Sequence, residues 1–116
     1  MAMVTVIKRF FGSKEEAIAD IKNEGFWPFA WMDKPGDSFE PHCHANDERL
    51  YLVEGSLDFE DVGTHRVFKL EPGDKLILPA RTVHRGRTDV GAKYIVSMKE
   101  LVHFNDHALP PEAATR

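Results

Sequence analysis

Four side chains of the types that bind transition metals lie between positions 42 and 84: His42, His44, Glu48 and His84. On an extended strand successive side chains alternate faces, so His42 and His44 would point the same way. Four extended residues span about 13 Å, whereas ligand atoms lie about 2.0–2.2 Å from the ion they share. We therefore expect a bend at 45–47, where turn-forming residues occur, with Glu48 entering on the neighbouring strand.

Three neutral imidazoles and one carboxylate form a mixed nitrogen and oxygen ligand set. Such a set suits one divalent ion of Fe, Mn, Ni, Cu or Zn and disfavours calcium. His84 can join the site only if a barrel brings distant strands together. An octahedral ion would keep two positions open for water, dioxygen or a chelating substrate. Glu48 could remain a ligand or dissociate and act as a catalytic base.

The elements that position these residues are expected to be mostly short strands. After Gly25, runs of strand-favouring residues alternate with turn residues, which is typical of an all-β sandwich or barrel. No helical segment follows residue 25, so a βαβ arrangement is excluded. The expected strands cover residues 4–11, 29–32, 49–53, 56–61, 65–70, 75–78, 82–85 and 93–98.

One short N-terminal helix is predicted before the strands. Ser13 is a suitable N-cap, and Glu16, three residues later, completes a capping box. Apolar residues then recur at helical spacing, and Gly25 supplies a C-terminal stop. We expect a helix over 14–24, and we expect it to cover an open end of a barrel.

The length and composition indicate one globular domain. The chain has 116 residues, of which 42% are hydrophobic and 29% charged, an ordinary globular balance. We divide the single domain 1–116 into an N-terminal strand and helix (1–28), a barrel core (29–100) and a loosely held C-terminal tail (101–116). The net charge of -4 argues against a nucleic-acid or anionic-membrane surface. No apolar stretch approaches the length of a membrane span.

The cysteine content and the N-terminus point to the cytoplasm. Cys43 is the only cysteine, so no intrachain disulfide can form. The first residues lack the apolar segment of a signal peptide. By strand alternation Cys43 faces away from the proposed ligands, and we expect it to have a packing or surface role.

The metal-binding residues occur in a recognisable pattern. The first motif of the cupin family reads G-x5-H-x-H-x3-E-x6-G, and Gly36, His42, His44, Glu48 and Gly55 match it at every spacing. The chain therefore resembles the cupins. In that family the two histidines and the glutamate of this motif bind the metal.

The second cupin motif, G-x5-P-x-G-x2-H-x3-N, is partly degraded. Gly73, Pro79 and His84 match it, but Arg81 replaces its second glycine and Thr88 its asparagine. The resemblance implies that His84 is the fourth metal ligand. Glycine tolerates positive φ, so the turn at Arg81 is expected to be strained or differently shaped.

The resemblance to cupins implies a small antiparallel jelly-roll β-barrel and a homodimer. Cupin relatives include flavonol, thiol and acireductone dioxygenases, oxalate-degrading enzymes and sugar-phosphate isomerases. The leading hypothesis is a mononuclear metal-dependent dioxygenase acting on a small organic molecule. The alternatives are a non-catalytic sensor or storage module and a metal-dependent isomerase or decarboxylase. Barrel, helix and tail occupy the whole chain, so we expect no DNA-binding domain.

Five residues are candidates for a substrate pocket above the metal: Phe29, Trp31, Leu50, Arg81 and Tyr94. Phe29 and Trp31 share a strand face and either fill the core or line an apolar pocket. Strand alternation from Glu48 places Leu50 inside, and Tyr94 could offer its hydroxyl there. Arg81 is either a solvent-facing loop residue or a clamp for a substrate carboxylate.

Overall fold

The computed structural model describes residues 3–99 and 108–115, and its regular elements are mostly strands. They are β1 (Thr5–Ile7), α1 (Lys14–Asn23), β2 (Trp27–Asp33), β3 (Ser38–His42), β4 (Glu48–Gly55), β5 (Leu57–Asp61), β6 (Arg66–Leu70), β7 (Lys75–Leu78), β8 (His84–Arg87), β9 (Ala92–Met98) and the 3-10 helix η1 (Pro111–Thr115). The predicted all-β class with one short N-terminal helix is confirmed.

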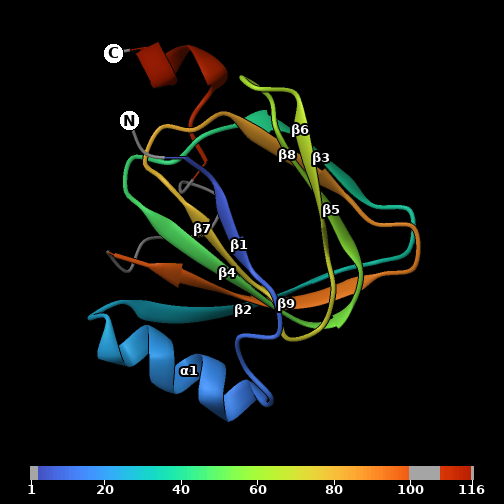
Figure 1. The fold of residues 1–116 in the computed structure, drawn as a ribbon. Helices are drawn as coiled ribbons and strands as arrows, with labels where there is room; N and C mark the ends of the chain where they lie inside the picture. Colours follow the sequence, from blue (N-terminus) through green and yellow to red (C-terminus); the bar gives the residue numbers. More distant parts are fainter. Residues whose placement is uncertain (1–2, 100–107, 116) are drawn as a thin grey trace.

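The strands form two antiparallel sheets that face each other (Figure 1). One sheet has the order β1-β7-β4-β9-β2 and the other the order β3-β8-β5-β6. This arrangement is jelly-roll-like, as expected. Among the described strands no ladder joins the two sheets, so they form two facing layers and not the closed barrel that was expected.

The main core lies between the two sheets. Leu50 and Leu52 from β4 and Tyr94 from β9 are buried there against Leu57 and Phe59 from β5. The inward direction of Leu50 follows the strand alternation expected from Glu48, and Tyr94 points inward as suggested separately. Each fully buried large apolar side chain contributes about 1.5–3 kcal/mol to folding, so this layer gives the site a rigid wall.

The helix begins where its sequence predicts. The Ser13 side chain accepts a hydrogen bond from the Glu16 backbone N–H (3.2 Å), which caps the first turn. The Glu16 carboxylate accepts a hydrogen bond from the Gly12 backbone N–H (3.1 Å), one residue before the position that a standard capping box uses. The carboxylate thereby ties the entry loop to the helix.

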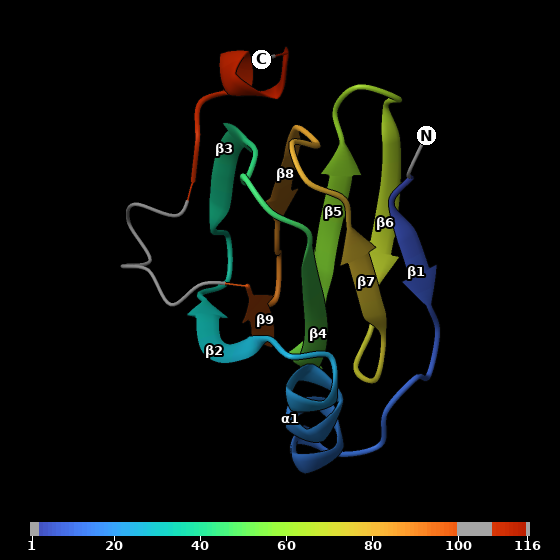
Figure 2. The same ribbon diagram turned by 90° about the vertical axis from the view of Figure 1, so that its left-hand side faces the viewer.

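The helix packs on the outer face of the five-stranded sheet (Figures 1 and 2). Ala17 and Ile21 are fully buried there in a second apolar cluster with Tyr51 and Ile95. The expectation that the helix covers an open end of a barrel is therefore wrong. Tyr51 and Ile95 point outward from their strands, and their apolar surface has to be removed from water.

A polar network fastens the helix to the sheet. The buried Lys75 donates to the Asp20 carboxylate (2.6 Å) and lies 3.4 Å from Glu24. The Tyr51 hydroxyl donates to the same oxygen of Asp20. Burial is the largest single influence and acts to raise the pKa of Asp20. The hydrogen bonds from Lys75 and Tyr51, together with the positive charges of Lys75 and Arg49, outweigh burial and lower the pKa from its usual value of 3.8.

This lowered pKa predicts an acid-sensitive contribution to stability. Because the folded-state pKa lies below the unfolded value, the contribution is complete above about pH 4 and is lost as the pH falls through the folded value. We expect Asp20→Asn to lower the free energy of unfolding by about 1–3 kcal/mol at pH 7. The deficit should shrink below pH 4. Denaturant titrations from pH 7 to pH 3 measure both effects, with the exposed Glu15→Gln on the same helix as control. A deficit independent of pH would contradict the assignment.

The first strand is shorter than the expected 4–11 because the chain turns after Ile7. Arg9 adopts a left-handed backbone (φ 52°), and the backbone N–H groups of Phe10 and Phe11 both donate to the Gly73 carbonyl. Lys8 hydrogen-bonds the buried Asp74 carboxylate, which fixes the end of the strand beside the loop before β7.

Part of the predicted C-terminal tail is anchored. Leu109 and Cys43 exchange two backbone hydrogen bonds (2.8 and 3.0 Å), and η1 follows, so this part is not loosely held. Residues 100–107 and 116 lie outside the described residues.

Within the described residues no helix combines the length and apolar character needed to cross a membrane.

Candidate metal centre

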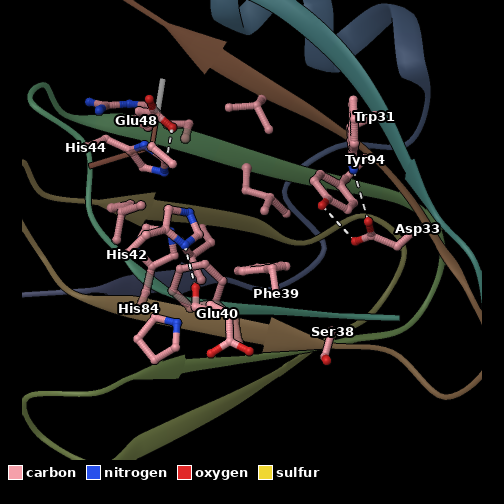
Figure 3. A pocket seen from close by; sticks show the side chains of 18 of the residues that line it. Trp31, Asp33, Ser38, Phe39, Glu40, His42, His44, Glu48, His84 and Tyr94 are labelled. Atoms are coloured by element: carbon pink, nitrogen blue, oxygen red, sulfur yellow. Dashed lines mark hydrogen bonds and ion pairs between the residues drawn. The ribbon is translucent and has the colours of Figure 1, made fainter. Parts of the chain in front are cut away.

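Two of the predicted ligands face each other across one strand pair. His42 is the last residue of β3 and His84 the first residue of β8, and they are direct partners in the ladder. His44 follows β3 by two residues. The candidate ligand nitrogens of the three rings all lie within 4.8 Å of one another, and Figure 3 shows the rings gathered at one end of a cavity. The structure therefore brings the three predicted histidines together.

Glu48 reaches the histidines from the opposite sheet. The chain bends at residues 45 and 46, and Glu48 then begins β4, which belongs to the five-stranded sheet, whereas β3 belongs to the other. The bend is confirmed, but the expectation that Glu48 enters on the strand beside β3 is wrong. The Asp47 carboxylate accepts a hydrogen bond from the Ala80 N–H (2.7 Å). This bond helps hold the crossing between the sheets.

The buried Glu48 carboxylate lies 3.7 Å from Nε2 of the buried His44. Two ligand atoms that each lie about 2.1 Å from one ion are at most about 4.2 Å apart. This contact is therefore short enough for one ion to bind both residues. The role of Glu48, as a fourth ligand or as a base, remains a prediction. Among the described residues, the group whose ligand atoms all lie within 4.8 Å of one another consists of the three histidines alone.

Hydrogen bonds to backbone carbonyls orient two of the imidazoles. Nδ1 of His42 lies 2.8 Å from the Glu40 carbonyl oxygen, and Nδ1 of His84 lies 2.9 Å from the Thr82 carbonyl oxygen. A carbonyl oxygen can only accept, so in both rings Nδ1 carries the hydrogen and Nε2 is left as a lone-pair donor. Metal-binding histidines are commonly held in this way. This donor set fits a divalent transition metal.

Two phenylalanines support the imidazoles. The Phe59 ring stacks on His84 (centroids 5.0 Å apart, 10° between planes). Phe39 makes edge contacts with His42 and His84 at centroid distances of 5.3 and 6.3 Å. Neither residue was expected at the site from the sequence. The sequence offers one signal for Phe59, its spacing of two residues from Leu57 along β5. This spacing indicates that the side chain points inward, but it does not indicate a contact with His84.

A glycine makes room for one of these rings. A Cβ atom placed on Gly86 would lie 2.4 Å from Cζ of Phe39, so Gly86→Ala must displace this ring, which contacts His42 and His84. We expect about tenfold weaker metal binding, comparable with the loss of a supporting contact. Calorimetric titration with Ni²⁺ measures the change. The control is Gly63→Ala, where the nearest atom would be at 3.6 Å. Equal affinities for the two variants would rule out support by Phe39.

A cavity of about 490 Å³ opens from the metal cluster between the sheets. The three histidines and Glu48 line one end, and apolar side chains make up much of the remaining lining. These are Phe39, Leu50, Phe59, Leu76, Leu78 and Val96. A volume in this range suits a small organic ligand.

The predicted pocket residues separate into two groups. Trp31, Leu50 and Tyr94 line this cavity, whereas Phe29 and Arg81 are not among its lining residues. Phe29 packs against the main core and stacks on Trp31 with ring centroids 6.1 Å apart. Phe29 thus lies beside Trp31 on the same face of β2, next to the cavity lining.

Arg81 holds the C-terminal segment. Its guanidinium donates to the Ala113 carbonyl oxygen (2.7 Å), and its backbone has φ 60°. The strained turn expected where the motif has glycine is therefore present. The guanidinium contact suits the anchoring of η1, and nothing in it favours the clamp for a substrate carboxylate.

Cys43 is fully buried and packs toward the C-terminal segment, where its thiol lies 3.6 Å from the Pro110 carbonyl oxygen. Burial, the largest influence, raises the pKa of the thiol, which keeps it protonated and poorly nucleophilic. The contacts support the packing role expected for this residue.

Comparison with known proteins identifies the domain. The profile of the family described as "Cupin domain" matches residues 29–98, which include all four candidate ligands. No curated protein matches the sequence significantly.

Solved structures share the fold at low sequence identity. A DUF861 family protein from Thermotoga maritima is 16% identical with a TM-score of 0.61, covering 83% of this chain and 99% of that chain. A cupin superfamily protein from Desulfitobacterium hafniense is 14% identical with a TM-score of 0.58, covering 84% and 79%. The polyketide cyclase RemF from Streptomyces resistomycificus is 19% identical with a TM-score of 0.56, covering 78% and 68%. At these identities the likeness concerns the fold alone.

Proposed function

The chain belongs to the cupin domain family, and we propose that it is a mononuclear metal-dependent dioxygenase acting on a small organic molecule. His42, His44 and His84, with Glu48 as the fourth ligand, hold one divalent ion of Fe, Mn, Ni, Cu or Zn. The observation that carries this proposal is the cluster of three imidazoles at the end of a cavity of about 490 Å³.

A bound ion would supply Lewis acidity and exchangeable positions for a small ligand. The residues of the chain supply the rest. Carbonyl hydrogen bonds keep Nε2 of His42 and His84 available, and the apolar walls exclude water and orient the ligand body. Glu48, beside His44, is the side chain placed to accept a proton from a bound ligand once it dissociates from the ion.

Oxygen uptake tests the proposed reaction. The protein is reconstituted separately with Fe²⁺, Mn²⁺, Ni²⁺, Cu²⁺ and Zn²⁺ and is supplied with a panel of diketones, thiols and flavonols. We expect oxygen consumption with one metal and one substrate class, abolished by chelation. Turnover without oxygen consumption would favour an isomerase or decarboxylase. Tight binding without any turnover would favour a sensor or storage module.

A homodimer in the cytoplasm completes the proposal. β2 is an edge strand of the five-stranded sheet, and its Trp27 and Met32 side chains are more than half exposed. An exposed apolar edge strand is a common site of self-association. Light scattering is expected to give twice the chain mass, and a monomeric mass at high concentration would refute the dimer.

A further inference from the structure

The cavity has a second polar end, formed by Asp33, Trp31 and Tyr94 (Figure 3). The Asp33 carboxylate accepts one hydrogen bond from the Trp31 indole N–H (3.0 Å) and one from the Tyr94 hydroxyl (2.8 Å). Burial, followed by the charge of Asp33, raises the pKa of Tyr94, so the hydroxyl remains a donor. A carboxylate has about four acceptor sites, and two of them are used here.

The strand register separates this end from the metal cluster. Tyr94 lies opposite Leu52 in the β4–β9 ladder, and Glu48 precedes Leu52 by four residues along β4. Four extended residues span about 13 Å. Apolar side chains such as Leu50 and Val96 line the wall between the two ends, so a ligand that reaches both must be elongated with an apolar body.

Most of the charged side chains that line the cavity are negative. The only lysine or arginine among the described lining residues is Arg49, and its side chain turns away: Nε lies 3.2 Å from Glu24, and the guanidinium lies over the Phe26 ring. The lining carboxylates are Asp33, Asp37, Glu40 and Glu48. An anionic group at the Asp33 end would therefore meet carboxylates, and no lysine or arginine among the described lining residues is directed there to compensate its charge.

We propose that the cavity selects an elongated ligand that binds the metal at one end and carries an amine at the other, with the ammonium group donating to Asp33. Ligands whose distal group is a carboxylate or phosphate are disfavoured. This inference rests on the proposed metal function and names its ligand class.

Matched catechols test the contribution of the distal group to binding separately from that of the metal-binding group. Dopamine, 4-ethylcatechol and 3-(3,4-dihydroxyphenyl)propanoate present the same chelating group and differ in the charge of the distal arm. Each is titrated calorimetrically into the Ni²⁺-loaded protein. We expect dopamine to bind at least about tenfold more tightly than the propanoate, with 4-ethylcatechol between them. The ammonium group of dopamine gains a charge-assisted hydrogen bond to Asp33, whereas the carboxylate of the propanoate is repelled by it.

Variants identify the residue responsible. Asp33→Asn is expected to reduce the preference for dopamine to about twofold or less while Ni²⁺ still binds. The control is the exposed Asp89→Asn, outside the cavity, which keeps the full preference. Equal or tighter binding of the propanoate by the Ni²⁺-loaded wild-type protein would overturn this inference alone. Failure of the wild-type protein to bind Ni²⁺ would overturn the proposed function and the inference together.

Discussion

Replacement of His84 by alanine is expected to weaken Ni²⁺ or Co²⁺ binding at least about a hundredfold. Loss of an outer partner already costs tenfold to a hundredfold, and His84 is a direct candidate ligand oriented by the Thr82 carbonyl. The truncation also leaves space beside Phe59, whose ring stacks on His84. Calorimetric titration measures the affinity, and thermal unfolding without metal shows that the variant folds.

The control for this prediction is His65→Asn. His65 is exposed in the turn before β6, outside the three-histidine cluster, and asparagine tolerates its left-handed backbone (φ 59°). This variant should keep the wild-type affinity. Wild-type affinity in His84→Ala would remove His84 from the metal site.

Gly55→Ala is expected to destabilise the protein by about 4 kcal/mol or more, the range of exceptional substitutions. Gly55 ends β4 with φ +84°, and a Cβ atom there would lie 1.9 Å from the Gly91 carbonyl oxygen. That oxygen accepts the Ser56 N–H (3.1 Å), so it cannot move away without breaking the turn. Equilibrium unfolding in urea measures the loss.

A second glycine of the first motif provides the matched control. Gly36 also has a left-handed backbone (φ +88°), but a Cβ atom there would meet nothing within 4 Å. Gly36→Ala should therefore cost only the backbone strain, about 1–2 kcal/mol. Similar losses for the two variants would show that the approach to Gly91 is not the cause.

Local spacing was sufficient to predict much of the site. The pattern of His42, His44 and Glu48 required a bend at 45–47, and the structure has that bend. Alternation from Glu48 placed Leu50 inside, and Ser13 with Glu16 located the start of the helix. Each of these features depends on residues close together in the chain, so their types and spacing determine it.

The features that were not predicted depend on contacts between distant strands. Glu48 lies on the opposite sheet because β4 pairs with β7 and β9, which the motif spacing does not specify. Support of His42 and His84 by Phe39 requires the pairing of β3 with β8 and the space at Gly86. These relations follow from strand register, and no local sequence pattern encodes them.

Two further features could not be predicted from local sequence for the same reason. They are the helix that covers the outer face of the five-stranded sheet and the Asp33 end of the cavity. Tyr51 reads as an outward strand residue, yet it is fully buried because the helix returns over it. Asp33 carries no local signal for a site, and it meets Tyr94 only because β2 pairs with β9.

The metal centre is tested most directly by detecting the nitrogen atoms that coordinate a bound ion. The protein is loaded with one equivalent of Cu²⁺, the copper content is measured by elemental analysis, and pulsed electron paramagnetic resonance detects nitrogen couplings to the ion. We predict one tightly bound ion per chain, coupled to imidazole nitrogens that are reduced in number by His84→Ala and unchanged by His65→Asn. Failure to retain the ion, or a spectrum without imidazole couplings, would contradict a metal centre built from His42, His44 and His84.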